Sequence, residues 1–215
     1  MPSSARLLPA GLWLVLTMLV SGPVFAKGCP DARGYTSHGS ESFSSGAPVG
    51  GHSIERDGMH IDVVPNSSNL WISNATFGNA WICVSFQFPK EVAAQGELGL
   101  VFWFVNSNDF SVIVASPDGF LRVYRNLNGN WTEIQSAKTG DMVASVPDPH
   151  SDYMGNSLQA VATGNRLQVI LNDFRIMTVE MTPPEGRWSA GIFAQARGNE
   201  RYSAHFPSVE LIELK

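Results

Sequence analysis

The feature that most constrains the fold is a series of short apolar–polar alternations separated by tight-turn dipeptides, clearest between residues 156 and 193. Gly164-Asn165 and Asn172-Asp173 interrupt runs in which every second residue is apolar. A period of two is typical of strands with one buried face, and Gly, Asn and Asp pairs between such runs are typical of hairpin turns. The segment therefore predicts two short antiparallel hairpins.

The same pattern continues through most of the chain. Residues 80–88 alternate in the same way, and Asp57-Gly58 is a turn signal between two further runs. Residues 98–105 are apolar on both faces, which is typical of a strand that lies centrally in its sheet or lines a hydrophobic groove. Turn signals recur about every 8–12 residues and no segment has helical periodicity, so we expect an all-β, two-sheet antiparallel β-sandwich.

The order of these segments resembles a known superfamily. "ESFSSG" is followed by "HSIERDGMHIDV", and the hairpins are followed by "RWSAGIF". This order resembles concanavalin A-like β-jelly rolls, which include laminin G-type modules, legume lectins, laminarinase-type glucanases and 3-keto-disaccharide hydrolase-type domains, with the first and last of these nearest. The resemblance covers about residues 41–215 and implies a jelly roll. Because that scaffold carries binding modules, enzymes and structural proteins alike, it does not define a function.

The N-terminus resembles an export signal. Arg6 precedes a short apolar run, and Val24 and Ala26 occupy the small-residue positions that a signal peptidase reads. The run is shorter than the ~20 residues of a membrane-spanning helix. We therefore expect a signal peptide at 1–26, a Gly/Ser-rich lead-in at 27–51, a sandwich domain at 52–215, and a periplasmic or extracellular protein without a membrane span.

Two cysteines, Cys29 and Cys83, lie in the exported part. Thiols pair in oxidising compartments, so we expect a disulfide that stabilises the fold by ~4 kcal/mol. The alternative is that Cys29 is lipidated, although Lys27 occupies a position where a lipidation signal usually has a small neutral residue.

The charge pattern restricts the partners. The formal net charge is −5, and no cluster of basic residues could neutralise phosphates. Nucleic acid is therefore excluded as an expected partner, whereas a glycan or another component of the cell envelope is consistent with an exported sandwich. The sequence leaves the oligomeric state open.

Motifs for catalysis and metal binding are weak. Glucanases of this fold usually carry Glu-x-Asp-x-x-Glu, but residues 55–60 have His60 in place of the second Glu and a turn at Asp57-Gly58, so we expect an ordinary hairpin. The five histidines are scattered without the spacing of a zinc site, and we predict no metal and no cofactor. Calcium at Asn106, Asn108 and Asp109 remains an alternative, as does a divalent cation at residues 148–152.

Aromatic and polar residues give the one indication of a ligand site. Sugars stack their C–H faces on aromatic rings and bond to polar side chains. Arg122 and Tyr124 share the face of their strand opposite Leu121 and Val123, and the next strand begins near Trp131. The predicted ligand-binding residues are Trp103, Arg122, Tyr124, Trp131, Gln195 and Arg197. The alternatives are that Trp103 belongs to the core and that Gln195 and Arg197 form a solvated rim.

Three functions fit these observations. The first is an exported non-catalytic module that binds carbohydrate or another envelope component. The second is a saccharide hydrolase of the 3-keto-disaccharide hydrolase type, with its catalytic residues unassigned, and the third is a structural envelope protein. A binding module needs exposed aromatic residues, so burial of Tyr124 and Trp131 would exclude the predicted face. A glycosidase needs two facing carboxylates ~5–9.5 Å apart, for which Asp109, Asp118 and Glu133 are the candidates.

Overall fold

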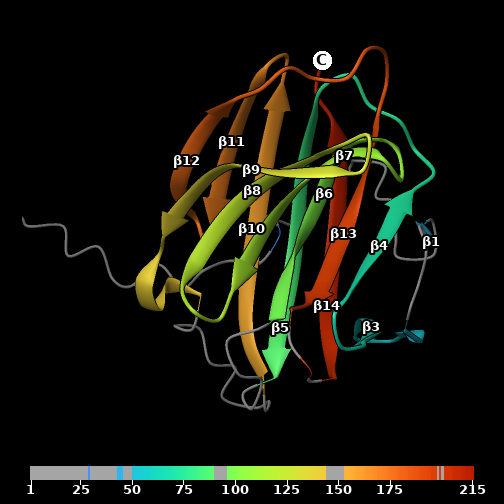
Figure 1. The fold of residues 1–215 in the computed structure, drawn as a ribbon, viewed down its shortest axis with the longest axis vertical. Helices are drawn as coiled ribbons and strands as arrows, with labels where there is room; N and C mark the ends of the chain where they lie inside the picture. The colour runs from blue at the N-terminus through green and yellow to red at the C-terminus, as the bar shows by residue number, and fades with distance from the viewer. Residues whose placement is uncertain are drawn as a thin grey trace, which may run out of the picture.

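The computed structural model describes residue 29 and residues 43–45, 50–89, 96–143, 153–197, 199 and 201–215. Within these ranges the chain forms two antiparallel sheets of seven strands each, stacked face to face (Figure 1). One 3-10 turn, η2 (Gly140–Met142), is the only helical element of the described residues. The predicted all-β sandwich is confirmed.

The two sheets are called sheet A and sheet B. Sheet A has the order β1 (Phe43–Ser45), β4 (Ser67–Ser73), β13 (Ser189–Ala196), β6 (Gly96–Asn106), β7 (Asp109–Ser116), β8 (Phe120–Leu127) and β9 (Asn130–Lys138). Sheet B has the order β12 (Phe174–Glu180), β11 (Arg166–Leu171), β10 (Tyr153–Thr163), β5 (Ala80–Pro89), β14 (Tyr202–Glu213), β3 (Gly58–Val63) and β2 (His52–Glu55).

The predicted hairpins are present, and their turns adopt the backbone that their residues favour. Gly164 joins β10 to β11 with φ +54°, and Asn172 and Asp173 join β11 to β12 with φ +48° and +66°. Positive φ angles suit two-residue hairpin turns, and Gly, Asn and Asp tolerate them best. Asp57-Gly58 likewise joins β2 to β3, so the stretch from residue 55 to 60 is a hairpin as expected.

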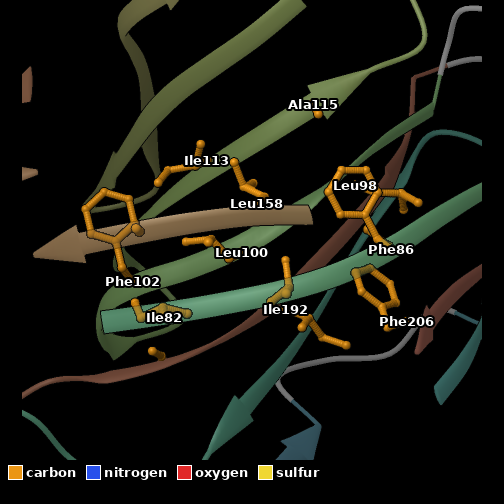
Figure 2. Close-up of a cluster of buried hydrophobic side chains, with 14 of the residues drawn as sticks. Ile82, Phe86, Leu98, Leu100, Phe102, Ile113, Ala115, Leu158, Ile192 and Phe206 are labelled. Atoms are coloured by element: carbon orange, nitrogen blue, oxygen red, sulfur yellow. The ribbon is translucent and has the colours of Figure 1, made fainter. Parts of the chain in front are cut away.

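The main core lies between the sheets and follows the alternation read from the sequence. On β5 the side chains of Ile82, Val84, Phe86 and Phe88 are buried. Figure 2 shows Ile82 and Phe86 in one apolar cluster with side chains of sheet A such as Leu98 and Leu100. The opposite face of β5 therefore points away from sheet A and forms part of the outer face of sheet B.

The predicted disulfide between Cys29 and Cys83 is confirmed, with a Cα–Cα distance of 5.6 Å. Cys83 lies on the outer face of β5, and the Cys29 backbone N–H donates a hydrogen bond to Ser85 Oγ at 3.4 Å. The bridge therefore holds residue 29 on the outer face of sheet B. Lipidation of Cys29 is incompatible with this bond.

The expected signal peptide at 1–26 and most of the lead-in at 27–51 lie outside the described residues, so these boundaries stay predictions. In the part of the chain that the structure describes, no helix has the length and apolar character needed to cross a membrane.

Candidate functional site

The outer face of sheet A carries a second apolar cluster, separate from the core between the sheets. Its buried members are Ile72, Val101, Phe110, Val112, Val114 and Phe193, and Leu70, Phe104 and Tyr124 pack against it. Side chains of a strand alternate between the two faces of its sheet, so β6 and β7 are apolar on both sides. We call this surface, completed by Trp131, the aromatic face.

Trp131 of β9 covers part of the cluster. Its ring centroid lies 5.3 Å from that of Phe110, 6.3 Å from Tyr124 and 6.2 Å from Phe193. Phe193 is on β13, four strands away in the sheet order, where a flat sheet would separate the two Cα atoms by ~19 Å. Two side chains cannot bridge that distance, so sheet A curls and the aromatic face is concave. Figure 1 shows β9 crossing the molecule obliquely.

A glycine lies at the centre of this concave surface. Gly99 of β6 pairs with Phe193 on β13 and with Val114 on β7. A Cβ atom at Gly99 would lie 1.9 Å from the backbone oxygen of Ile113, far inside any tolerated contact. Only glycine therefore permits this approach of β6 to β7.

A polar network borders the aromatic cluster. Glu97 is only 2% exposed, and Arg197 Nε donates to its Oε2 at 2.9 Å while Arg122 Nη1 donates to its Oε1 at 3.4 Å. Arg197 Nη2 also donates to the Tyr124 hydroxyl oxygen at 2.7 Å. Arg122 Nη2 donates to Asp118 Oδ2 at 3.3 Å. The network holds two guanidinium groups and a phenol in fixed positions beside the rings.

The charges of this network balance. Burial raises the pKa of Glu97, although Arg197 and Arg122 oppose that shift. Burial also disfavours ionised Asp118, but hydrogen bonds from Ser116 and Arg122 outweigh this and lower its pKa. Two arginines therefore face two carboxyl groups, and the formal charges cancel.

The structure brings five of the six predicted ligand-binding residues onto this one face. Arg122 and Tyr124 lie on β8, Trp131 lies on β9, and Gln195 and Arg197 lie at and just beyond the end of β13. Trp131 is 46% exposed and Tyr124 is half-buried, so the condition for a binding face is met. The arrangement presents a ring with free surface beside anchored hydrogen-bond donors.

Trp103 does not reach this face. It is 1% exposed and packs in the main core, with its ring centroid 5.1 Å from that of Phe102. Strict alternation along β6 would point it outward, but its φ of +53° and the irregular register between Phe102 and Asn106 turn it inward. Its assignment to the ligand site was therefore wrong, and the alternative that it belongs to the core is confirmed.

The sequence did not single out Glu97, Phe110 or Phe193. The sequence did contain one signal for Glu97, because it is a single carboxylate next to residues 98–105, which are apolar on both faces. A carboxylate buried in such a strand needs a charged or hydrogen-bonding partner. The two phenylalanines had no distinguishing signal, because their role depends on which strands become neighbours.

The loop proposed for calcium acts as a turn here. Asn106 Oδ1 accepts a hydrogen bond from the Asn108 backbone N–H at 2.8 Å, and Asp109 pairs with Arg125. The calcium alternative stays a prediction. Residues 148–152 lie outside the described part of the chain.

Searches against known proteins identify the fold. No protein-family model matches the sequence, and no curated protein resembles it significantly. The chain is similar in structure to the carbohydrate-binding module CBM66 from Bacillus subtilis, with a TM-score of 0.60, 15% identity, and coverage of 80% of this chain and 96% of that chain. It is also similar to the carbohydrate recognition domain of Emp46p, with a TM-score of 0.56, 10% identity, and coverage of 81% and 90%.

A part of a larger protein is also among the similar structures. The GH43 protein BlXynB from Bacillus licheniformis matches with a TM-score of 0.52 and 13% identity, over 73% of this chain and 33% of that chain. At such identities the likeness shows the fold alone. The fold of the protein is therefore a β-sandwich of the concanavalin A-like jelly-roll type.

Proposed function

We propose that the protein is an exported, non-catalytic module that binds a neutral glycan through the aromatic face. The observation that carries this proposal is the meeting of Trp131, Tyr124 and Arg197 on one concave surface. Aromatic rings bind the apolar faces of sugars, and a few fixed polar groups select among hydroxyl arrangements. The similar structures that are described as carbohydrate-binding modules or recognition domains support the same class of ligand.

The charge balance of the network favours an uncharged ligand. Arg122 and Arg197 already face Glu97 and Asp118, so neither guanidinium is left to pair with a uronic acid or a sulfate. Their remaining N–H groups are suited to hydroxyl oxygens. We therefore expect neutral hexose or pentose units rather than acidic sugars.

A binding role is favoured over hydrolysis because the carboxylates beside the rings are already engaged. Glu97 forms ion pairs with two arginines and Asp118 with one. A glycosidase needs two carboxyl groups that can act as acid and base on the substrate, and these two are occupied by arginines instead. Asp109, another candidate, pairs with Arg125.

Export is supported by the disulfide. Structural disulfides persist mainly in oxidising compartments, and Cys29 follows the expected cleavage site after Ala26 by only a few residues. Mass spectrometry of the protein from a secreting host should give a mature N-terminus at Lys27. A retained Met1 would contradict the proposal.

The binding proposal is tested by a thermal-shift screen against oligosaccharides and cell-wall fragments, followed by calorimetry with any ligand found. Trp131→Ala should weaken binding roughly 30-fold, the effect of losing an interface aromatic worth about 2 kcal/mol. Tyr124→Phe removes the oxygen that accepts from Arg197 and should weaken binding roughly 5-fold, equivalent to about 1 kcal/mol. Phe174→Ala is the control, because Phe174 is 64% exposed on β12 of sheet B.

Each outcome has a defined meaning. Binding that is lost in Trp131→Ala and kept in Phe174→Ala supports the aromatic face. No shift with any sugar, in protein shown to be folded, would contradict glycan binding and favour a structural role. Release of new reducing ends from a bound oligosaccharide would contradict the non-catalytic assignment.

A further inference from the structure

Sheet B brings two distant histidines together on its outer face. His60 of β3 and His205 of β14 are direct cross-strand partners, and His205 is also paired with Gln87 of β5. The two imidazole rings are stacked, with centroids 4.2 Å apart and planes at 6°. Asp57, in the turn between β2 and β3, completes a group whose ligand atoms all lie within 4.8 Å of one another.

The backbone holds this group in place. Gly58 approaches β14 so closely that a Cβ atom there would lie 2.4 Å from the Phe206 backbone oxygen, which fixes the Asp57 turn against the strand. A register irregularity follows His205 on β14, and such bulges re-aim side chains locally. His205 is buried, and its Nδ1 lies 2.9 Å from Gln87 Oε1.

Both ring nitrogens of His205 have a hydrogen-bond partner, Gln87 at Nδ1 and the Asp57 backbone oxygen at Nε2, and the tautomer decides which nitrogen carries the proton. When Nδ1–H donates to Gln87 Oε1, the lone pair is on Nε2, and Nε2 lies 3.0 Å from the Asp57 backbone oxygen and 3.6 Å from Asp57 Oδ2. In the other tautomer Nε2–H donates a hydrogen bond to the Asp57 backbone oxygen, and a metal ion bound at Nε2 would replace that proton. Metal-binding histidines are typically oriented in this way, by a hydrogen bond from the other ring nitrogen to a carbonyl or carboxylate.

We infer that Asp57, His60 and His205 form a binding site for a divalent transition-metal ion of the zinc, nickel and copper class. Imidazole and carboxylate donors suit these ions, and neighbouring ligand atoms around an ion with bonds of about 2.1 Å lie about 3.0–3.4 Å apart. His60 Nε2 lies 3.2 Å from Asp57 Oδ1, within that range. The stacked His60 ring must turn about χ2 to share an ion with His205, and its side chain, 22% exposed, has access to the solvent in which to do so.

The site also has access to solvent. His60 lines a surface pocket of about 340 Å³ that also includes Glu55 and Asp62. An ion can reach His60 through this pocket, and two further carboxylates give the pocket a negative potential. Because the three residues lie on sheet B, the outcome of a metal-binding experiment does not depend on whether sheet A binds a glycan.

The test is a calorimetric titration of the untagged, chelator-treated protein, disulfide intact, with ZnCl₂ and with CuCl₂. We expect one ion per chain, bound at micromolar concentration or tighter. His60→Ala and Asp57→Asn should each weaken binding by at least the roughly 10–100-fold that loss of an outer-shell partner costs. His52→Ala is the matched control, since His52 lines the same pocket but packs its ring against Trp71.

A spectroscopic readout separates this site from adventitious binding. The electron paramagnetic resonance spectrum of the Cu²⁺ complex should show hyperfine coupling to two imidazole nitrogens in the wild type. In His60→Ala it should show coupling to one imidazole nitrogen. Absence of binding by the folded wild-type protein would overturn the inference, because a proton on His205 Nε2 would then account for the short contacts. Binding that is unchanged in both variants would overturn it as well.

Discussion

Replacing Gly99 by alanine is expected to lower the free energy of unfolding by about 3 kcal/mol or more. The new Cβ atom would lie 1.9 Å from the Ile113 oxygen, so β6 and β7 would have to separate by about 1.5 Å to restore ordinary contact at 3.4 Å. Such a shift breaks the hydrogen bonds between the two strands at this point. Overpacking costs about 1–3 kcal/mol, and each lost hydrogen bond adds about 1 kcal/mol.

Urea unfolding followed by tryptophan fluorescence measures this change, because ΔG falls linearly with denaturant. Gly78→Ala is the matched control: no heavy atom lies within 4 Å of its added Cβ, and its φ is not positive. That variant should stay within about 1 kcal/mol of the wild type, with a gain favoured by the reduced entropy of the unfolded chain. A loss below 1 kcal/mol in Gly99→Ala, or equal losses in both variants, would refute the steric argument.

Three further predictions concern the disulfide, the buried carboxyl group and a buried phenol. Joint replacement of Cys29 and Cys83 by serine should cost about 4 kcal/mol in urea unfolding, from the entropy gained by the opened 54-residue loop of the unfolded chain. Burial raises the pKa of Glu97 above its ordinary value of 4.5, so its stabilising contribution is complete below pH 4.5 and is lost as pH rises through the folded pKa. As the pH rises from 4.5 through the folded pKa, the free energy of unfolding of the wild type should fall relative to that of Glu97→Gln. The fall should be about 1.4 kcal/mol for every tenfold difference in proton affinity of Glu97 between the folded and unfolded states. Equal pH profiles of unfolding for the two proteins would contradict this prediction. Tyr202→Phe removes the hydrogen bond from its hydroxyl to the Gln195 backbone oxygen at 2.7 Å and should cost about 1–2 kcal/mol in thermal unfolding, whereas an unchanged melting temperature would show that this bond adds nothing.

Local pattern was sufficient to predict the strands and much of the aromatic face. Alternation on β5 identified its buried side chains, and Asn and Gly pairs identified the turns, because both are properties of a few neighbouring residues. Arg122 and Tyr124 could be assigned to one surface for the same reason. Their partners could not be predicted in this way.

What the sequence could not provide was the pairing of distant strands and the places where the backbone departs from regular geometry. Phe193 meets Trp131 only because sheet A curls, and His60 meets His205 only because β3 and β14 are neighbours. Trp103 fails the alternation rule because a single positive φ redirects it. The first two contacts depend on residues far apart in the chain, whereas the third depends on a local backbone irregularity that the residue pattern does not encode.

The position of the disulfide has a practical consequence for measurement. Cys29 is covalently fixed to β5 on the outer face of sheet B, whereas Trp131 lies on the outer face of sheet A, on the opposite side of a two-layer molecule. A biosensor chip coupled through the N-terminal segment should therefore present the aromatic face to the flowing analyte and place the histidine pair nearer the support. Random coupling through lysines would mix these orientations. A larger fraction of glycan-binding molecules after N-terminal capture than after lysine coupling would show that the aromatic face lies opposite the attachment point.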